Sequence, residues 1–327
     1  MKALVIPRFG DPDVLTWTDQ PEPVPGPGEL LVRVRAFAVN WADLMQRAGR
    51  YPGGPTPPFI AGHDLVGEVV GRGPDTAGPP DGTRVFGVLG RAGGAAELVA
   101  APAAWFHPVP EILSNEQAAG LAGPYFTADV AIQDFGRLRS GETVLVHAAA
   151  GGYGSAAVQL CRHYRAGTII ATAGGDDKVR RIKEWGVDVA VNYQTSDFVE
   201  IVGDVTKGRG VDLVLESVGG EVLGKSFDCI APLGRLVSVG ASSGESSRRF
   251  RLQTLFERGI SVAGFTLGLW LQNRPELVQA AARRVLEAVR AGSVVPVIGG
   301  VFPIEEIADA HAFMAGRRSI GRTVVVI

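Results

Sequence analysis

The sequence is poor in cysteine, in excess charge and in long apolar runs. Its two cysteines, Cys161 and Cys229, are too few for a disulfide framework or a cysteine-rich zinc site and are typical of a reducing compartment. Because 34 acidic residues nearly balance 32 basic ones, the positive surface typical of nucleic-acid-binding proteins is missing. No signal-peptide pattern and no run of about 20 apolar residues occurs. We therefore expect a cytoplasmic protein that binds neither nucleic acid nor membrane.

Two regions of the chain differ in their hydrophobic pattern. Up to about residue 110, short apolar or alternating runs are separated by proline and glycine, which is typical of β-strands. From about Gly141, apolar runs alternate with helix-length segments, which predicts an α/β fold of βαβ units around a buried parallel sheet. In the first region strands are predicted over 30–35, 65–70, 83–88 and 95–100. The second region predicts strands over 143–146, 168–172, 188–191, 211–215 and 235–239, then helices over 275–291 and 305–315 and a strand over 323–327.

A glycine-rich turn follows the first strand of the second region. The spacing Gly152-x-Gly154-x-x-Ala157 lies between a predicted strand and a predicted helix. Glycines at these positions allow a tight turn and let backbone N–H groups approach a pyrophosphate at the helix N-terminus. Because further strand–helix pairs follow, the pattern predicts a dinucleotide site and not merely a glycine-rich turn.

The end of the next strand bears on which dinucleotide is bound. An NAD site places an acidic side chain there, about 20 residues after the glycines, to bind the ribose 2′-hydroxyl. This chain has the neutral stretch Ala173-Gly174-Gly175, followed by Lys178, which favours NADP. The alternative remains that Lys178 and Arg181 lie on a solvated helix face and that Asp176 reaches back to the ribose.

Several motifs together resemble a known family. They are His147–Leu160, Asp212–Gly220, Val39–Asp43, Pro58–Gly67 and Ser319–Ile327. Over the whole length the chain resembles the zinc-independent quinone oxidoreductase branch of the medium-chain dehydrogenase/reductases. The resemblance implies a GroES-like catalytic domain over 1–122, a Rossmann NADP-binding domain over 123–265 and a return to the catalytic domain over 266–327. It also implies a homodimer joined edge to edge through the cofactor-domain sheets.

The same resemblance implies roles for individual residues. The residues on the nicotinamide side are Asn40, Asp43 and Thr127. The pyrophosphate residues are Ala150, Gly151, Gly152, Tyr153 and Gly154. The 2′-phosphate residues are Gly174, Lys178 and Tyr193, and the loop under the nicotinamide is Val239, Gly240, Ala241 and Ser242. Tyr153 departs from the family, whose members usually carry a small aliphatic residue there; its ring either narrows the cleft or points away.

The zinc ligands of related enzymes are mostly missing. Zinc-dependent members of the superfamily hold a catalytic zinc with Cys, His and Cys, and only His63 of that set is present. The first cysteine position is occupied near Asn40-Trp41, and the second near Gly123-Pro124-Tyr125. Asp43, His63 and Asp64 could form an oxygen-rich metal site, but Asp43 belongs to the Asn-x-x-Asp signature of the metal-free branch. We therefore expect no metal, and we interpret His63 as a hydrogen-bonded histidine at the start of a strand.

Without a metal to polarise an alcohol, hydride transfer needs an acceptor that is already electrophilic, such as a quinone or an α,β-unsaturated carbonyl. Tyr51 resembles the family tyrosine that lines the substrate cleft, where it either donates a proton or only shapes the wall. Two alternatives remain open. One is an enoyl reductase of the polyketide-synthase type. The other is an NADPH-binding sensor or crystallin-like protein with little turnover.

The missing cysteine ligands generate a first prediction. We expect chelator-treated protein to keep its full reductase activity and elemental analysis to find no stoichiometric zinc, because the chain lacks the ligand set that would hold the ion. One tightly bound zinc per chain, with activity lost on its removal, would contradict this expectation.

Overall fold

The computed structural model describes residues 1–245 and 252–327 and divides the chain into two compact units. Unit 1 comprises Met1–Gly123, Leu267–Ala282 and Val295–Ile327, and unit 2 comprises Pro124–Thr266 and Arg283–Val294. Unit 1 is rich in β-strands and unit 2 contains a parallel sheet between helices, so the predicted α/β class is confirmed. Within the described residues, no helix is long and apolar enough to cross a membrane.

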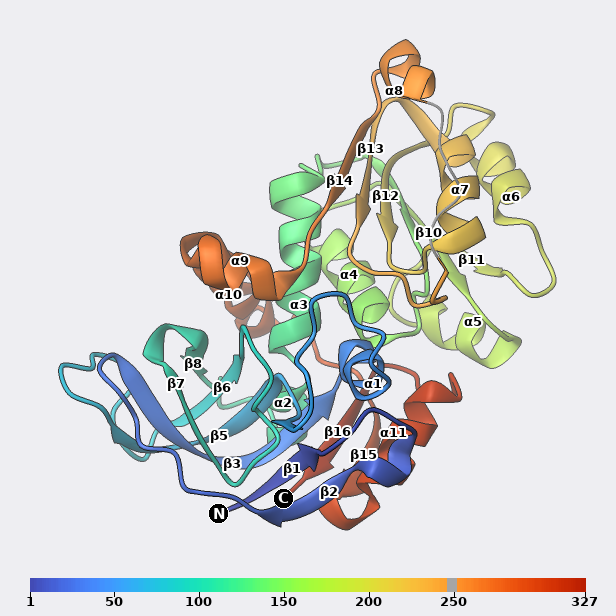
Figure 1. Cartoon of the computed structure of the whole chain (residues 1–327). Helices are drawn as coiled ribbons and strands as arrows, with labels where there is room; N and C mark the ends of the chain where they lie inside the picture. The colour runs from blue at the N-terminus through green and yellow to red at the C-terminus, as the bar shows by residue number, and fades with distance from the viewer. Residues whose placement is uncertain (246–251) are drawn as a thin grey trace. The chain divides into compact units, whose positions relative to one another are not determined.

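Unit 1 is built on two sheets (Figure 1). The larger sheet has the order β15-β16-β3-β5-β6-β8, with β7 also paired to β3, and the smaller has the order β2-β1-β4. The larger sheet contains β3 (Glu29–Val39), β5 (Asp64–Arg72), β6 (Arg84–Val88), β7 (Leu98–Pro102), β8 (Phe106–Pro108), β15 (Ile298–Pro303) and β16 (Arg322–Val326). The smaller contains β1 (Lys2–Ile6), β2 (Thr16–Asp19) and β4 (Phe59–Ile60), and the helices of the unit are α1 (Trp41–Arg47), α2 (Asn115–Ala119), α9 (Leu267–Asn273) and α11 (Ile307–Ala315).

The strand order of unit 1 brings distant parts of the sequence together. The C-terminal strand β16 runs antiparallel to β3, with Thr323 opposite Val39. On the other side of β3, Asp64 at the start of β5 pairs with Ala38. The start of β16, the end of β3 and the start of β5 therefore lie next to one another, above a core that includes Phe37, Leu65 and Val325.

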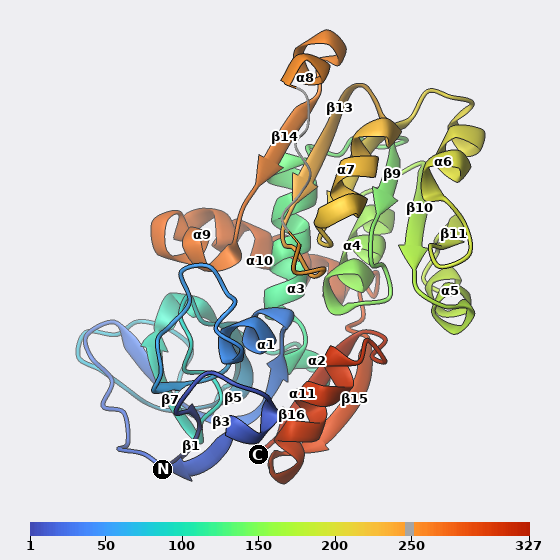
Figure 2. The ribbon, with the colours of Figure 1, turned by 45° about the vertical axis from the view of Figure 1, so that its right-hand side comes forward.

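Unit 2 has one six-stranded sheet with the order β11-β10-β9-β12-β13-β14, all neighbours parallel. Its strands are β9 (Thr143–Val146), β10 (Thr168–Ala173), β11 (Val189–Asn192), β12 (Val211–Glu216), β13 (Ile230–Ser238) and β14 (Ser261–Gly264). Its helices are α3 (Ala122–Asp129), α4 (Gly152–His163), α5 (Asp176–Lys183), α6 (Phe198–Thr206), α7 (Gly220–Cys229) and α8 (Leu252–Arg258). Figures 1 and 2 show α3 and α4 on one side of the sheet and α6 and α7 on the other. Chain order reverses between β9 and β12, which is where ligands bind in doubly wound sheets.

The predicted elements are largely present, with differences that have physical reasons. The strand expected at Arg235 begins at Ile230, because Pro232 and Gly234 resemble a turn in sequence although the strand passes through them. At this point the pairing with β12 shifts register, and Leu233 adopts a left-handed backbone with φ 64°. Elements that the sequence did not predict are α1, α2, α3, α6, α8, α9, β1, β2, β4, β8, β14 and β15, and the start of β7 was expected at residue 95, three residues too early.

An ion pair with a buried carboxylate attaches the second half of α10 (Pro275–Arg290) to the rest of unit 2. Arg284 donates through Nε to Asp129 Oδ2 over 2.7 Å and through Nη2 to Asp134 Oδ2 over 2.8 Å. The side chain of Asp129 is fully buried and also accepts a hydrogen bond from the hydroxyl of Tyr164. Breaking such a pair leaves a buried charge without its partner, which costs more than the pair itself contributes.

We expect Arg284→Met to lower the free energy of unfolding by about 3 kcal/mol, because it strands the buried carboxylate of Asp129. Urea unfolding followed by tryptophan fluorescence would measure this change. The matched control is Arg180→Ala, which removes an exposed partner of Asp177 in the same unit and should cause no measurable loss. Equal stability of Arg284→Met and the wild-type protein would show that the pair contributes nothing.

Candidate functional site

Three polar side chains meet where β3, β5 and β16 begin or end, and we call them the Asn40 cluster: Asn40, Asp64 and Arg322. Arg322 Nη2 donates to Asp64 Oδ2 over 2.6 Å, and its Nη1 donates to Asn40 Oδ1 over 3.0 Å. Asn40 Nδ2 donates in turn to Asp64 Oδ2 over 3.1 Å. Asp64 is fully buried and Arg322 is 4% exposed, so the hydrogen bond between them is shielded from water, whereas Asn40 is half-buried.

Gly123 completes the surroundings of Asp64. Its backbone N–H donates to Asp64 Oδ1 over 2.9 Å. A Cβ atom at position 123 would lie 2.6 Å from both carboxylate oxygens, so no other residue fits there while Asp64 keeps its place. Both oxygens of Asp64 are thus occupied by donors from unit 1 itself.

Asp43 lies on the first turn of α1, three residues after Asn40. Its Oδ2 accepts the backbone N–H of Asn40 over 2.7 Å, which fixes the start of the helix. Its Oδ1 is buried, has no hydrogen-bond partner among the residues that the structure describes, and lies 3.8 Å from His63 Nε2. Burial raises the pKa of Asp43 above its ordinary value, and the nearby His63 opposes this shift.

His63 is hydrogen-bonded on both sides of its ring, directly before β5. Nε2 lies 3.2 Å from Gln46 Oε1 and Nδ1 lies 3.3 Å from the carbonyl oxygen of Leu89. This arrangement agrees with the interpretation of His63 as a hydrogen-bonded histidine. Among the described residues, Asp43, His63 and Asp64 do not form a group of His, Cys, Asp or Glu side chains that could hold a metal ion.

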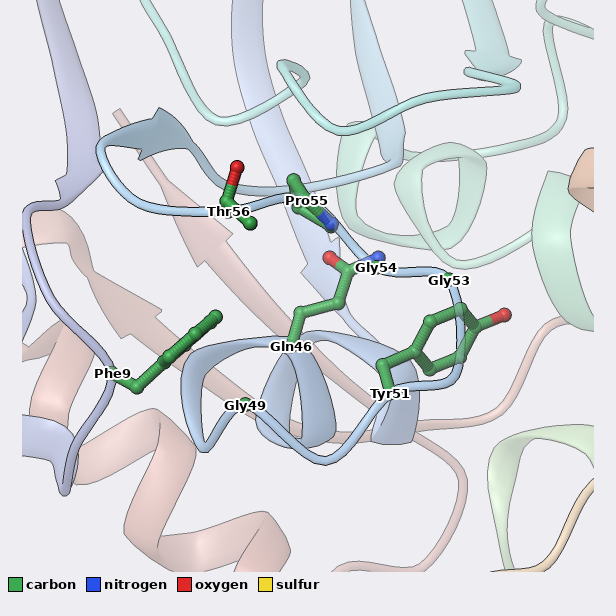
Figure 3. Close-up of a pocket in the computed structure, with 8 residues that line it drawn as sticks. All are labelled: Phe9, Gln46, Gly49, Tyr51, Gly53, Gly54, Pro55 and Thr56. Atoms are coloured by element: carbon green, nitrogen blue, oxygen red, sulfur yellow. The ribbon is translucent and has the colours of Figure 1, made fainter.

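Tyr51 lies beside a small pocket in the loop after α1 (Figure 3). The pocket has a volume of about 160 Å³, smaller than the roughly 300–1,000 Å³ typical of sites for drug-sized ligands. In Figure 3 the amide of Gln46 lies between Phe9 and Tyr51, and the hydroxyl of Tyr51 points away from Phe9 and Thr56. Burial and the charge of Asp43 raise the pKa of Tyr51, so its hydroxyl stays protonated at neutral pH and can donate.

In unit 2 the glycine-rich turn joins β9 to α4. Gly151 caps the helix in an extended conformation, and its N–H donates to the carbonyl of Ala148 over 2.9 Å. A Cβ atom on Gly154 would lie 2.3 Å from the oxygen of Ala148, so the turn and the helix approach each other as closely as glycine permits. Ala150 is buried, and Gly151 and Gly152 are half-buried. The turn thus places the N-terminus of α4 at the point where strand order reverses.

Tyr153, the departure from the family pattern, turns its hydroxyl inward. The hydroxyl oxygen is buried and has no hydrogen-bond partner within the part of the chain that the structure describes. Burial raises the pKa of Tyr153 far above its ordinary value, and Cys161 and Glu216 add to the shift. The hydroxyl therefore lies among buried groups of unit 2.

The residues predicted for the 2′-phosphate gather at the end of β10. The ring of Tyr193 covers Gly174 so closely that a Cβ atom there would lie 2.5 Å from the tyrosine oxygen. Gly175 has φ 92° and donates its N–H to Asn192 Oδ1 over 3.2 Å. Asp176 accepts a hydrogen bond from Asn192 Nδ2 over 2.7 Å, so its carboxylate is already engaged. Lys178 is half-buried on α5, two residues further on.

The loop after β13 lies against the end of β12. Val239 donates its N–H to the carbonyl of Glu216 over 2.9 Å, and Ser242 donates to the carbonyl of Ser217 over 3.0 Å. Gly240 and Ala241 lie between them, while Thr127 is half-buried on α3. The sequence analysis missed the buried Glu216, whose Oε1 accepts the N–H groups of Val218 over 2.6 Å and Gly219 over 2.7 Å. An acidic residue ending an apolar strand before Gly-Gly was the signal for it.

Two family models match the chain. The model described as alcohol dehydrogenase GroES-like domain matches residues 26–111, and the one described as zinc-binding dehydrogenase matches residues 152–283. Together they cover much of unit 1 and most of unit 2.

Curated relatives match the chain over nearly its whole length. The human synaptic vesicle membrane protein VAT-1 homolog is 34% identical, with 100% of this chain and 86% of that protein covered. The 2-haloacrylate reductase of a Burkholderia species is 33% identical, with coverage of 99% and 98%. The quinone oxidoreductase of Pseudomonas aeruginosa is also 33% identical, with 99% of both chains covered.

Solved structures give the same family. A mycobacterial protein complexed with NADPH has a TM-score of 0.91 at 30% identity over 100% of both chains. An NAD-dependent alcohol dehydrogenase has a TM-score of 0.89 at 32% identity, also over 100% of both chains. The folds of the two units, the family models and these relatives agree, and the chain belongs to the zinc-independent, quinone oxidoreductase-like branch of the medium-chain dehydrogenase/reductases.

Proposed function

We propose that the chain is an NADPH-dependent, metal-independent reductase of quinones and α,β-unsaturated carbonyls. The observation that carries this proposal is the Asn40 cluster. At the position where zinc-dependent relatives need a metal ligand, this chain has an amide whose oxygen and nitrogen are hydrogen-bonded to an arginine and a carboxylate. Such a site can donate hydrogen bonds but lacks a Lewis acid, which suits an acceptor activated by conjugation.

The residues of unit 2 fit a dinucleotide. The close approaches at Gly154 and Gly174 leave room only for glycine, and the free N-terminal N–H groups of α4 suit a pyrophosphate. Ala150, Gly151, Gly152, Tyr153 and Gly154 would hold that group, and Thr127 with the loop Val239, Gly240, Ala241 and Ser242 would border the nicotinamide. When bound, NADPH supplies the hydride.

The choice of NADPH over NADH depends on the end of β10. No acidic side chain follows the strand directly, and Asp176 is hydrogen-bonded to Asn192 rather than reaching out as an acceptor for a ribose hydroxyl. Gly174, Lys178 and Tyr193 would then surround the 2′-phosphate, with Lys178 as its cation. The NADPH found in the mycobacterial structure supports this choice, whereas the NAD-dependent relative has the opposite preference.

In unit 1, Asn40, Asp43 and Tyr51 are the catalytic residues of the proposal. Asn40 and Tyr51 each offer a hydrogen-bond donor, and the raised pKa of Tyr51 keeps its proton in place at neutral pH. Asp43 holds the backbone of Asn40 through a 2.7 Å hydrogen bond. The names of two relatives, quinone oxidoreductase and 2-haloacrylate reductase, support conjugated acceptors.

The cofactor proposal predicts that Lys178→Ala weakens NADPH binding about tenfold or more while hardly changing NADH binding, because a charge-assisted contact to phosphate is lost. Fluorescence titration of both cofactors would measure the two dissociation constants. Lys183→Ala, an exposed lysine at the end of the same helix, is the matched control and should change neither. Equal weakening of both cofactors would mean that Lys178 supports the fold instead.

The acceptor proposal predicts NADPH oxidation with 1,4-benzoquinone, naphthoquinones or simple enones. Primary alcohols with NADP should react at negligible rates, because hydrogen bonds alone activate a saturated alcohol poorly. Absorbance at the NADPH band, followed across a panel of acceptors, measures both reactions. Rapid alcohol oxidation by metal-free protein, or no turnover with any conjugated acceptor, would exclude this function.

A further inference from the structure

The Asn40 cluster distinguishes the two ends of an amide. Arg322 has only donors, so it must face the oxygen of Asn40, and an ionised Asp64 has only acceptors, so it must face the nitrogen. Turning the amide over would place donor against donor and acceptor against acceptor. The side chain of Asn40 is therefore held in one orientation, with one of its two N–H groups used by Asp64.

The rest of unit 1 makes this orientation rigid. The N–H of Gly123 holds the second oxygen of Asp64, so the carboxylate is anchored at both oxygens and its rotation is opposed. Asp43 holds the backbone N–H of Asn40 at the start of α1. Both carboxylates are buried, and burial strengthens the hydrogen bonds that they accept, because little water competes for their oxygens.

We propose that Asp64 and Arg322 are positioning residues that hold Asn40 as a hydrogen-bond donor to the carbonyl oxygen of the acceptor. This inference rests on the proposed reductase function and assigns to one amide N–H the polarising role that a metal has in zinc-dependent relatives. Reduction of a conjugated acceptor builds negative charge on its carbonyl oxygen, and a donor fixed in advance stabilises that charge without reorganising. Asn40 keeps its proton throughout, and water supplies the proton of the product.

A purely structural role is the alternative, and the chain contains a matched example of it. Asp129 and Arg284 form a second ion pair with a fully buried carboxylate, in unit 2, and the hydrogen bonds that the structure gives their side chains within its described residues go to Asp134 and Tyr164 and not to Asn40, Asp43 or Tyr51. Removing both charges of either pair should leave a folded protein, because the loss of a whole pair is tolerated far better than the loss of one partner. Comparing the two pairs therefore separates positioning from stability.

The experiment compares Asp64→Asn/Arg322→Met with Asp129→Asn/Arg284→Met, using NADPH and 1,4-benzoquinone. We expect the first double variant to lose about 10- to 100-fold in kcat, with the dissociation constant of NADPH within about twofold of wild type, because a misplaced donor costs rate rather than cofactor binding. The second should keep kcat within about twofold. Thermal unfolding of both variants shows that each is folded.

A double-mutant comparison gives the decisive result. Asn40→Ala should lower kcat about 100-fold or more in the wild-type protein but less than about threefold in the Asp64→Asn/Arg322→Met background, because the donor is already misplaced there. If the kcat losses of Asn40→Ala and of Asp64→Asn/Arg322→Met multiplied in the combined variant, the positioning role would be overturned. A folded Asp64→Asn/Arg322→Met protein with wild-type kcat would overturn it as well.

A separate readout distinguishes this inference from the proposed function. If the wild-type protein reduces no conjugated acceptor, the proposed function fails, and positioning is then tested by NMR of the side-chain amide of Asn40, assigned by its absence in Asn40→Ala. Slow hydrogen exchange of this amide in wild type and fast exchange in Asp64→Asn/Arg322→Met would support a fixed orientation. Equal exchange in both proteins would refute it.

Discussion

The ion pair between Asp64 and Arg322 joins two residues 258 positions apart, and the polar site of unit 1 depends on it. Charges buried this deeply are tolerated only when each remaining donor and acceptor is satisfied, and here Asn40 and the N–H of Gly123 meet most of that need. The ion pair therefore requires neighbouring residues that offer matching hydrogen-bond donors and acceptors. Because Arg322 is the first residue of β16, the pair also links the C-terminal strand to Asp64 at the start of β5.

Unit 2 follows a different principle, in which backbone groups rather than charged side chains make the site. The turn after β9 is held by hydrogen bonds from Ala149 to the carbonyl of Thr172 and from Gly151 to that of Ala148. The residues at the N-terminus of α4 are neutral, and the buried Glu216 turns both oxygens to donors of its own unit. A negatively charged ligand therefore meets N–H groups instead of carboxylates.

Features that depend on neighbouring residues could be predicted from the sequence, whereas features that depend on contacts between distant residues could not. The glycine turn, its flanking strand and helix, and the neutral end of β10 are local patterns, and the structure has them where the sequence analysis expected them. The partnership of Asp64 with Arg322 was not predicted, because it depends on which strands pair and no spacing in the chain encodes that. The early start of β13 was missed for another reason: Pro232 and Gly234 break the local pattern, whereas pairing with β12 at Ile230 and again from Arg235, where β14 also joins, anchors the strand on both sides of them. Pairing between strands thus overrides local preference.

The close contact between Gly123 and Asp64 has a consequence for protein engineering. A cysteine at position 123 would bring a Cβ atom to 2.6 Å from the Asp64 carboxylate, so it cannot be introduced while Asp64 remains. Removing Asp64 would in turn leave the guanidinium of Arg322 buried without its counter-charge. To introduce a thiolate ligand at position 123, Gly123, Asp64 and Arg322 would all have to be substituted together. Any one of these substitutions alone would destabilise the protein or fail to create the ligand. A single mutation at that position therefore cannot give this chain a thiolate metal ligand.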